Sequence, residues 1–377
     1  MDCFGRSREI SELWREFSYG KNLLMLAPRR IGKTVVLNEL KNSASENGFT
    51  AILIDVEGYS DEKAFFRDCC LSIQNEFSVG ERLIEQFNRR LSSLINGSDA
   101  PSADWKELLA KTDWKEFADQ LLASLDTFEG PEKWVILIDE LPIFVSALDK
   151  SSGEGTMSGF LYWLRAMRQK YKNIRWMYTG SVGLDAVARR NNIEGALNDL
   201  QSYTLSPFSM DTACEFIDFV ASRRSNTVQR EARDLLIERL SWLSPYYLER
   251  VVEAACIASS ENDVLGVPAI TQAIDHLLDL PQRTYWSSWG EHLNRNFPEP
   301  ERSHLYKILE CVCKSDAAVS ESHILGVLNA SSIEISSSNA RDFLHTLCSD
   351  GYLRTINGNY EFRMSLLKEW WAKYIVA

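Results

Sequence analysis

Short apolar runs alternate with amphipathic stretches through the first 207 residues of the chain. Four of five such runs are short and rich in apolar residues, which is typical of parallel strands buried on both faces. The stretches between them favour helices, and the alternation predicts a mostly parallel sheet with helices on both faces. We expect strands at residues 22–26, 51–56, 134–139, 174–179 and 202–205, and helices at 34–45, 62–77 and 105–125.

Two polar segments interrupt this pattern. Residues 88–104 lose periodicity, and we expect a loop inserted before the helix at 105–125. Residues 150–158 (KSSGEGTMS) hold small and flexible residues after the third strand, so we expect a second loop there, able to move.

The pattern becomes all helical after Pro207, with helices expected at 211–223, 230–242, 245–258 and 270–278. Pro281 and the NFPEP stretch mark a boundary, and three more helices follow at 302–313, 321–328 and 338–350. Two short strands joined by Asn357-Gly358 complete the parts of a winged helix. The expected organisation is an α/β core at 1–207, a helical domain at 208–295 and a winged helix at 296–377.

Composition narrows the class of protein. The 377 residues are 45% hydrophobic and 25% charged, as in folded chains, and no apolar run approaches the length of a membrane span. The first twenty residues lack an apolar signal core, so we expect a soluble, cytoplasmic protein with no membrane partner. The net charge of −12 argues against nucleic-acid binding over the whole surface. Neither the eight cysteines nor the five histidines show zinc-ligand spacing, and we expect reduced, mostly buried thiols.

The strongest chemical signal is the octet APRRIGKT at 27–34, which follows an expected strand and opens an expected helix. This is the context of a P-loop, where converging backbone N–H groups and the helix dipole bind phosphates. Lys33 is expected to reach the β- and γ-phosphates of ATP, and Thr34 to bind Mg²⁺. The first glycine of the motif is Ala27 here, and alanine does not tolerate positive φ. The nucleotide-binding candidates are Arg29, Arg30, Ile31, Gly32, Lys33, Thr34 and Val35.

A second signal supports the first. The apolar strand at 134–139 ends in Asp139-Glu140, where the aspartate can hold the Mg²⁺ shell and the glutamate can orient and deprotonate the attacking water. The alternative is that both acids cap a helix. The fourth strand ends in Thr179-Gly180-Ser181, and Thr179 or Ser181 would face the γ-phosphate if this strand lies between the P-loop and aspartate strands. Both are equally ordinary turn residues.

Several motifs together resemble one family. FGR at residues 4–6, APRRIGKT, ILIDE, TGSVGL, LSPFS and the closing FRMSLLKEWWAKYI look like those of the prokaryotic STAND and archaeal-type AAA+ P-loop ATPases, over nearly the whole chain. The resemblance implies a P-loop NTPase core with a helical lid and a C-terminal winged helix, using ATP and Mg²⁺. It also implies that the adenine is flanked by Phe4, Gly5, Arg6, Pro245 and Tyr246. Phe4 and Tyr246 could instead belong to the core, and Pro245 could simply begin a helix.

The resemblance leaves the source of a completing arginine open. Arg189-Arg190 could act on a neighbouring subunit, although a solvated helix face is the favoured interpretation, and Arg250 is a second candidate for the γ-phosphate. Residues 301–377 carry eight Lys plus Arg against nine Asp plus Glu, whereas a winged helix that binds DNA usually has a basic face. Arg341, His345, Arg354 and Arg363 could form such a face, but the basic residues are not concentrated. We expect the winged helix rather to transmit the nucleotide state.

The expected function is a nucleotide-dependent switch that hydrolyses ATP slowly and regulates a partner protein. Because the chain begins at the FGR segment and ends with the winged helix, we expect the effector or sensor to be a separate protein. Phage defence, transcriptional control and toxin regulation are all compatible, as is a homo-oligomer. The main alternative is a DNA-binding regulator that uses ATP to position its winged helix. A processive motor lacks pore loops and a firm trans arginine here, and a scaffold with a dead site conflicts with the intact Lys33, Thr34, Asp139 and Glu140.

Overall fold

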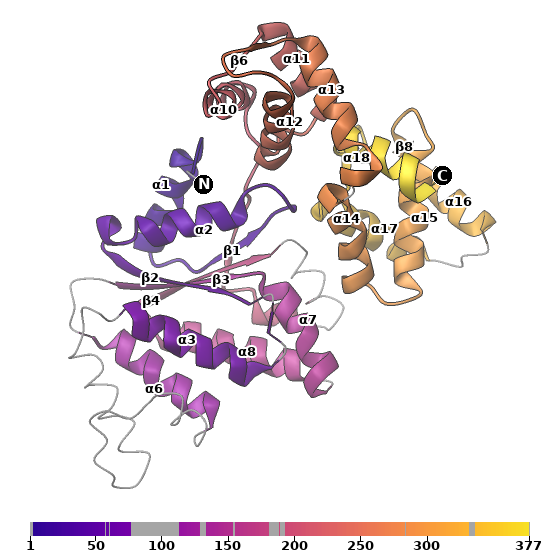
Figure 1. Cartoon of the computed structure of the whole chain (residues 1–377). Coiled ribbons are helices and arrows are strands. Elements are labelled where there is room, and N and C mark those ends of the chain that lie inside the picture. The colour runs from indigo at the N-terminus through magenta and orange to yellow at the C-terminus, as the bar shows by residue number, and fades with distance from the viewer. Residues whose placement is uncertain are drawn as a thin grey trace, which may run out of the picture. The chain divides into compact units, whose positions relative to one another are not determined.

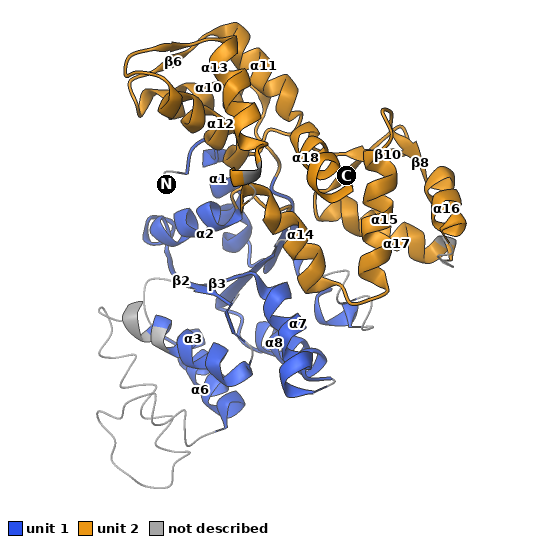
Figure 2. Ribbon diagram, turned by 45° about the vertical axis from the view of Figure 1, so that its right-hand side comes forward, with its two compact units in different colours: residues 1–26, 33–205 blue, residues 27–32, 206–377 orange. Residues whose placement is uncertain are grey.

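The structure, a computed structural model, describes residues 3–376 except residues 57, 60, 77–112, 129–132, 154, 181–187, 189–192, 283 and 332–335. The chain divides into two compact units (Figure 2). Unit 1 contains Met1–Leu26 and Lys33–Leu205, and unit 2 contains Ala27–Gly32 and Ser206–Ala377. The first six residues of the predicted P-loop therefore belong to the same compact unit as the C-terminal half of the chain.

Unit 1 is built on a five-stranded sheet in which all neighbouring strands are parallel. The strand order is β2-β3-β4-β1-β5, so β4 lies between β1 and β3, as the interpretation of the fourth strand required. The central strand β3 is buried from Trp134 to Asp139, which explains its uninterrupted apolar run. All five predicted strands are confirmed: β1 Leu23–Leu26, β2 Phe49–Asp55, β3 Lys133–Asp139, β4 Ile174–Gly180 and β5 Gln201–Tyr203.

Helices cover both faces of this sheet. Figure 1 shows α1 and α2 on one face and α3, α6 and α8 on the other. The core under the second group includes an aromatic cluster in which the Phe65 ring lies 5.3 Å from Phe144 and 5.4 Å from Phe160 between centroids. The helices are α1 Ser7–Ser18, α2 Lys33–Asn42, α3 Glu62–Glu76, α6 Trp114–Asp126, α7 Leu141–Ser152 and α8 Thr156–Lys170, with 3₁₀ turns at Ser45–Asn47 and Glu194–Ala196.

The loop expected at 150–158 is wrong for most of its length. Helix α7 continues to Ser152 and α8 begins at Thr156. The polar composition hid the buried Met157, whose backbone N–H donates to the Asp149 carboxylate at 2.8 Å and so ties the start of α8 to α7. Gly153, with φ 101°, lies in the short turn that remains. The loop expected at 88–104 lies outside the described residues.

After Ser206, unit 2 contains four helices near the positions where four helices were expected. The two short strands β6 and β7 of this segment pair parallel to each other. A fifth helix, α14, was not expected. Trp286, Trp289 and Leu293 are nevertheless buried along it. The elements are α10 Met210–Ser222, β6 Thr227–Val228, α11 Arg230–Leu240, α12 Pro245–Ala258, β7 Val264–Leu265, α13 Val267–Leu277, the 3₁₀ turn Leu280–Gln282 and α14 Thr284–Asn296.

The last segment has the element order of a winged helix. Three helices precede a hairpin whose strands β9 and β10 pair antiparallel, and β8 adds a third strand next to β10. Asn357 and Gly358 connect β9 to β10 with φ of 50° and 80°, the left-handed pair that an Asn-Gly hairpin turn needs. The elements are α15 Glu301–Cys313, β8 Val319–Ser320, α16 Glu321–Ala330, α17 Ser337–Ser349, β9 Leu353–Ile356, β10 Asn359–Phe362, α18 Ser365–Trp371 and a π-helical turn Ala372–Val376.

Candidate functional site

The candidate site lies at the carboxyl edge of the sheet in unit 1. Strands β1, β4 and β3 are neighbours, and their carboxyl ends meet at one edge, with Leu26 opposite Gly180 in the register of β1 and β4. Helix α2 begins at Lys33, immediately after the loop that leaves β1. In open parallel sheets, ligands bind outside this edge, so the topology alone brings the P-loop and the two predicted strand-end motifs together.

Asp139 is the centre of the site. Its carboxylate accepts a hydrogen bond from the Thr34 hydroxyl at 2.7 Å on Oδ2 and another from the Thr179 hydroxyl on Oδ1. The backbone N–H of Glu140 also donates to Oδ1, at 3.0 Å. Asp139 is 3% exposed and Thr179 is fully buried, so these bonds hold the carboxylate in one orientation. The structure thus brings together Thr34, Asp139 and Thr179 from α2, β3 and β4.

Thr179 has a contact within the protein in addition to the γ-phosphate role expected of it. Its hydroxyl donates to Asp139, which makes it a residue that positions the candidate metal ligand. The γ-phosphate role of Thr179 stays a prediction, and Ser181 lies outside the described residues.

Glu140 has a backbone conformation that is uncommon for its type. Its φ of 56° and ψ of 34° are left-handed, which costs about 1–3 kcal/mol for a residue other than glycine and tends to occur at functional sites. It occupies the N-cap position of α7, yet its side chain makes no capping hydrogen bond. The alternative that Glu140 serves as a helix cap is therefore not supported by its contacts.

Gly180 is a residue of this site that the sequence did not single out. A Cβ atom built on Gly180 would lie 2.4 Å from Cγ of Pro142, in the first turn of α7. Only glycine permits this approach of β4 to α7, directly beyond Asp139 and Glu140. The sequence signal was present in the TGS triplet, but a strand-end glycine is also an ordinary turn residue.

The backbone of the P-loop resolves the question raised by Ala27. The positive φ angles in the loop belong to Arg30, at 67°, and Gly32, at 98°, so alanine at the first position needs no unusual conformation. Lys33 is the first residue of α2, and it is only 6% exposed. Of the remaining loop candidates, Ile31 is buried, and Arg29 and Val35 are partly buried.

Within unit 2, the loop residue Arg30 contacts one of the predicted adenine-binding residues. The guanidinium carbon of Arg30 lies 4.2 Å from the ring centroid of Tyr246, and that of Arg250 lies 5.4 Å from the same centroid. Pro245 begins α12 in the first turn, where proline is favoured. The role of Pro245 and Tyr246 toward adenine stays a prediction, and the ring of Tyr246 already carries two cationic neighbours.

The N-terminal candidates lie just before α1. Arg6 is 4% exposed, occupies the N-cap position of α1 and pairs with Glu9 at 2.6 Å. Gly5 has a positive φ of 67°, and Phe4 is partly buried. Their expected contact with adenine stays a prediction. The candidate arginines Arg189 and Arg190 lie outside the described residues.

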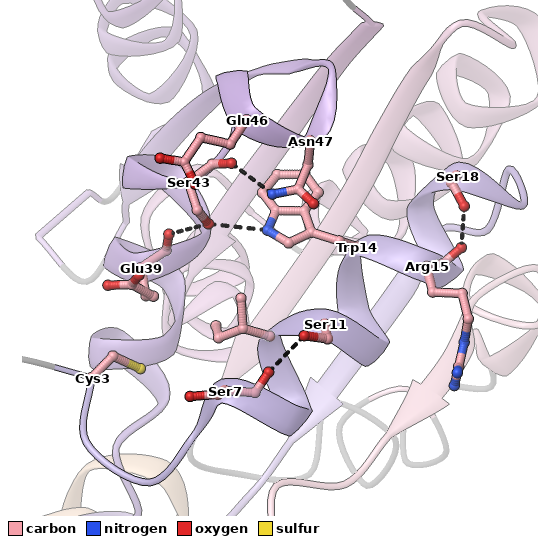
Figure 3. A pocket seen from close by; sticks show the side chains of 11 residues that line it. Cys3, Ser7, Ser11, Trp14, Arg15, Ser18, Glu39, Ser43, Glu46 and Asn47 are labelled. Carbon is pink, nitrogen blue, oxygen red and sulfur yellow. Dashed lines mark hydrogen bonds between the residues drawn. The ribbon is translucent and has the colours of Figure 1, made fainter.

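A hollow of about 550 Å³ lies in unit 1 between α1 and the end of α2 (Figure 3). None of the predicted phosphate or metal ligands lines it. Its polar groups largely bond to the protein itself: Trp14 Nε1 donates to Ser43 Oγ at 3.1 Å, and the Ser11 hydroxyl donates to the carbonyl of Ser7 at 2.8 Å. We therefore assign no nucleotide contact to this hollow.

An ion pair with a buried arginine fixes the segment that follows the fourth strand. The Arg168 side chain is inaccessible to solvent and donates to both carboxylate oxygens of Asp199, at 2.8 and 2.7 Å. It also donates to the Tyr178 hydroxyl at 3.0 Å and to the carbonyl of Ala196 at 2.7 Å. Burial raises the pKa of Asp199, but the hydrogen bonds and charge of Arg168 outweigh it and hold that pKa below its usual value.

In the parts of the chain that the structure describes, no group of three or more His, Cys, Asp or Glu side chains could hold a metal ion, and no helix is long and apolar enough to cross a membrane. The pair Thr34 and Asp139 nevertheless fits Mg²⁺. This ion prefers oxygen ligands and usually binds through one or two protein groups, with substrate phosphates and water completing its shell.

The chain is similar in structure to solved proteins, and two of them illustrate the likeness. A Walker-type ATPase of Pyrococcus abyssi matches with a TM-score of 0.66 at 17% identity, over 97% of this chain and 95% of that chain. The ORC2 protein of Aeropyrum pernix, solved in ADPNP–ADP complexes, matches with a TM-score of 0.58 at 12% identity, over 100% and 96%. This chain has the fold of the P-loop ATPases. No protein-family model and no curated protein sequence matches it.

Proposed function

We propose that this P-loop protein binds ATP with Mg²⁺ at Ala27–Thr34 and hydrolyses it slowly. The observation that supports this most is the 2.7 Å hydrogen bond between the Thr34 hydroxyl and the Asp139 carboxylate. These are the two residue types that share Mg²⁺ in P-loop NTPases, and they come from elements 105 positions apart in the sequence. A chance GKT in a surface loop would have no reason to meet a strand-end aspartate.

Each residue of the site has a role in this proposal. Lys33 binds the β- and γ-phosphates, and the helix dipole of α2 adds to the attraction for these anions. Thr34 and Asp139 bind Mg²⁺, which neutralises charge on the phosphates when it is present. Glu140 orients the attacking water and accepts its proton, a role consistent with a side chain that does not cap α7.

We further propose that the hydrolysis serves a STAND-type switch in the cytoplasm, which regulates a separate partner protein. The FGR, ILIDE and TGSVGL motifs support this assignment, as does the order of core, lid and winged-helix elements. A switch needs its nucleotide states to differ in their contacts, because a ligand shifts an equilibrium only by its differential affinity for the two states. A homo-oligomer is compatible with this proposal and is not required by it.

The alternative of a DNA-binding regulator is less well supported by the C-terminal segment. Its basic side chains are occupied: Arg341 pairs with Glu321 at 2.8 Å, and Arg354 pairs with Glu361 at 2.6 Å. Arg363 donates to the carbonyl of Cys348 at 2.8 Å. Phosphate binding would require these pairs to break, and the segment has no net positive charge to offset that cost.

Two substitutions test the proposed chemistry separately. ATP with Mg²⁺ raises the melting temperature of the parent chain by mass action, equivalent to about 2.7 kcal/mol at a hundredfold excess over Kd. Lys33→Ala abolishes this shift. Glu140→Gln keeps the shift but stops phosphate release, because the amide preserves shape and cannot take a proton. A Glu140→Gln variant that hydrolyses ATP at the parent rate shows that Glu140 has no catalytic role.

A further inference from the structure

The P-loop of this protein contains a residue that is unsuited to its own backbone conformation. Arg30 has a φ of 67°, a region that glycine adopts freely and arginine does not. The sequence of the loop does not explain the positive φ of Arg30, since Gly32 two positions later already supplies one flexible residue. Contacts from the rest of unit 2 must therefore compensate for the unfavourable conformation of Arg30.

Three contacts hold Arg30, and all come from residues of unit 2. Its guanidinium lies over the ring of Tyr246 at 4.2 Å, a cation–π geometry. Its Nη2 donates to the hydroxyl of Ser288, on α14, at 3.4 Å. Its backbone carbonyl accepts a hydrogen bond from the hydroxyl of Ser244. Side chain and backbone of one loop residue are thus fixed from two helices.

The hydroxyl of Ser244 donates to Arg30 although Ser244 occupies a helix N-cap position. Ser244 is the N-cap residue of α12, and a serine at this position usually accepts a hydrogen bond from its own helix. Here the buried Ser244 side chain makes no capping bond and donates to Arg30 instead. Ser209, the N-cap of α10, shows the ordinary arrangement, accepting from the N–H of Thr212 at 3.2 Å.

A close approach next to Arg30 limits the loop further. A Cβ atom on Gly351, at the end of α17, would lie 2.6 Å from Cβ of Pro28. The loop is therefore packed against the C-terminal segment at Pro28 as well as held at Arg30. Its shape depends on residues more than 200 positions away in the sequence.

We propose that Arg30 is a positioning residue that makes the phosphate-binding shape of the loop depend on Ser244 and Tyr246. This rests on the proposed function, because it concerns the affinity for nucleotide at the same loop. The arginine adopts its left-handed conformation only while the Ser244 and Tyr246 contacts hold it. When they are lost, a smaller fraction of molecules has a loop ready for phosphates, and the apparent affinity falls by that fraction. By reciprocity, bound nucleotide strengthens the contact of Arg30 with α12.

Alanine and glycine at position 30 separate this role from a general loss of packing. Both remove the guanidinium, but only glycine adopts positive φ without strain. The experiment titrates ADP and a non-hydrolysable ATP analogue, each with Mg²⁺, into the full chain by calorimetry. We expect Tyr246→Leu, Ser244→Ala and Arg30→Ala each to weaken binding, by about three- to tenfold. Arg30→Gly binds about tenfold more tightly than Arg30→Ala.

The decisive measurement is the double variant. In the presence of Arg30→Gly, the further change Ser244→Ala alters affinity less than twofold, because the loop no longer needs the contact. Ser209→Ala removes an ordinary N-cap of the same unit and leaves affinity unchanged, which controls for loss of a serine cap. Melting curves without nucleotide confirm that each variant is folded.

Two results overturn the proposal while the proposed function stands. One is a parent chain that binds ATP together with Tyr246→Leu and Ser244→Ala variants that bind it equally well. The other is an Arg30→Gly variant as weak as Arg30→Ala. A folded parent chain that binds neither nucleotide overturns both the proposed function and the role of Arg30.

Discussion

Replacing Thr179 by valine tests whether this residue positions Asp139. Valine keeps the branched shape but removes the hydroxyl that donates to Oδ1 of Asp139. Asp139 is 3% exposed, so water does not readily replace the lost donor. It keeps the Glu140 N–H on the same oxygen, at 3.0 Å, and the Thr34 hydroxyl on the other.

The magnitude follows from these contacts. A hydrogen bond to a charged group contributes about 1.5–3 kcal/mol to stability. Because two donors remain on Asp139, we expect a loss of about 2 kcal/mol in the free energy of unfolding of unit 1. For a domain of roughly 150–250 residues, this lowers the melting temperature by about 4–8 °C. The less constrained carboxylate also binds Mg²⁺ more weakly, by about tenfold, as is typical when a group that orients a metal ligand is removed.

The assay is denaturant-induced unfolding together with a Mg²⁺ titration of nucleotide binding. The matched control is Thr346→Val, because Thr346 is 7% exposed and its hydroxyl donates at 2.8 Å to a neutral carbonyl, that of Asp342. The control is expected to cost less than about 1 kcal/mol and to leave the Mg²⁺ dependence unchanged. Thr179→Val behaving like Thr346→Val in both measurements refutes the positioning role. A change confined to discrimination between ATP and ADP indicates instead that Thr179 faces the γ-phosphate.

Two further predictions concern residues that pack around the site. Gly180→Ala forces a methyl group against Pro142, where it would lie 2.4 Å from Cγ, and is expected to destabilise by about 1–3 kcal/mol in thermal unfolding. Gly159→Ala, in an exposed part of α8 with nothing within 4 Å of the added atom, should instead stabilise by about 0.5–1 kcal/mol, and equal effects of the two would contradict the argument. Arg168→Met leaves the partly exposed Asp199 without its buried partner and should cost about 1.5–3 kcal/mol. Since the folded pKa of Asp199 is lowered, its contribution is present above the unfolded pKa of about 3.9 and is lost as pH falls through the folded pKa, so the difference between parent and variant in unfolding experiments shrinks toward low pH.

Much of the site was predictable because its signals are local. A P-loop needs a strand, a tight turn and a helix in sequence, and residues 22–34 carry all three. The aspartate at the end of an apolar strand is equally local, since a strand buried on both faces excludes a charge except at its end. The parallel order of the strands then brings Thr34 and Asp139 to one edge, so their meeting could be expected before any distance was measured.

The missed features depend on neighbours that are remote in the sequence. The glycine at position 180 is required only because Pro142 of another element lies against it. The polar composition of residues 150–158 favoured a loop. The hydrogen bond from the backbone of Met157 to Asp149, which ties α8 to α7, is not visible in the sequence pattern.

Arg30 shows most clearly which features local sequence determines and which features tertiary contacts determine. By sequence it is an ordinary P-loop position whose backbone N–H is expected to bind phosphate, and residue type alone disfavours positive φ there. The tertiary structure supplies Ser244, Tyr246 and Ser288, and their contacts make that conformation stable. The sequence therefore determined the strands, the P-loop and the acidic pair through local pattern. Which loop residue takes the left-handed conformation, and which helices hold it there, was decided by long-range packing, because compensation for a strained residue comes from whatever surrounds it in space.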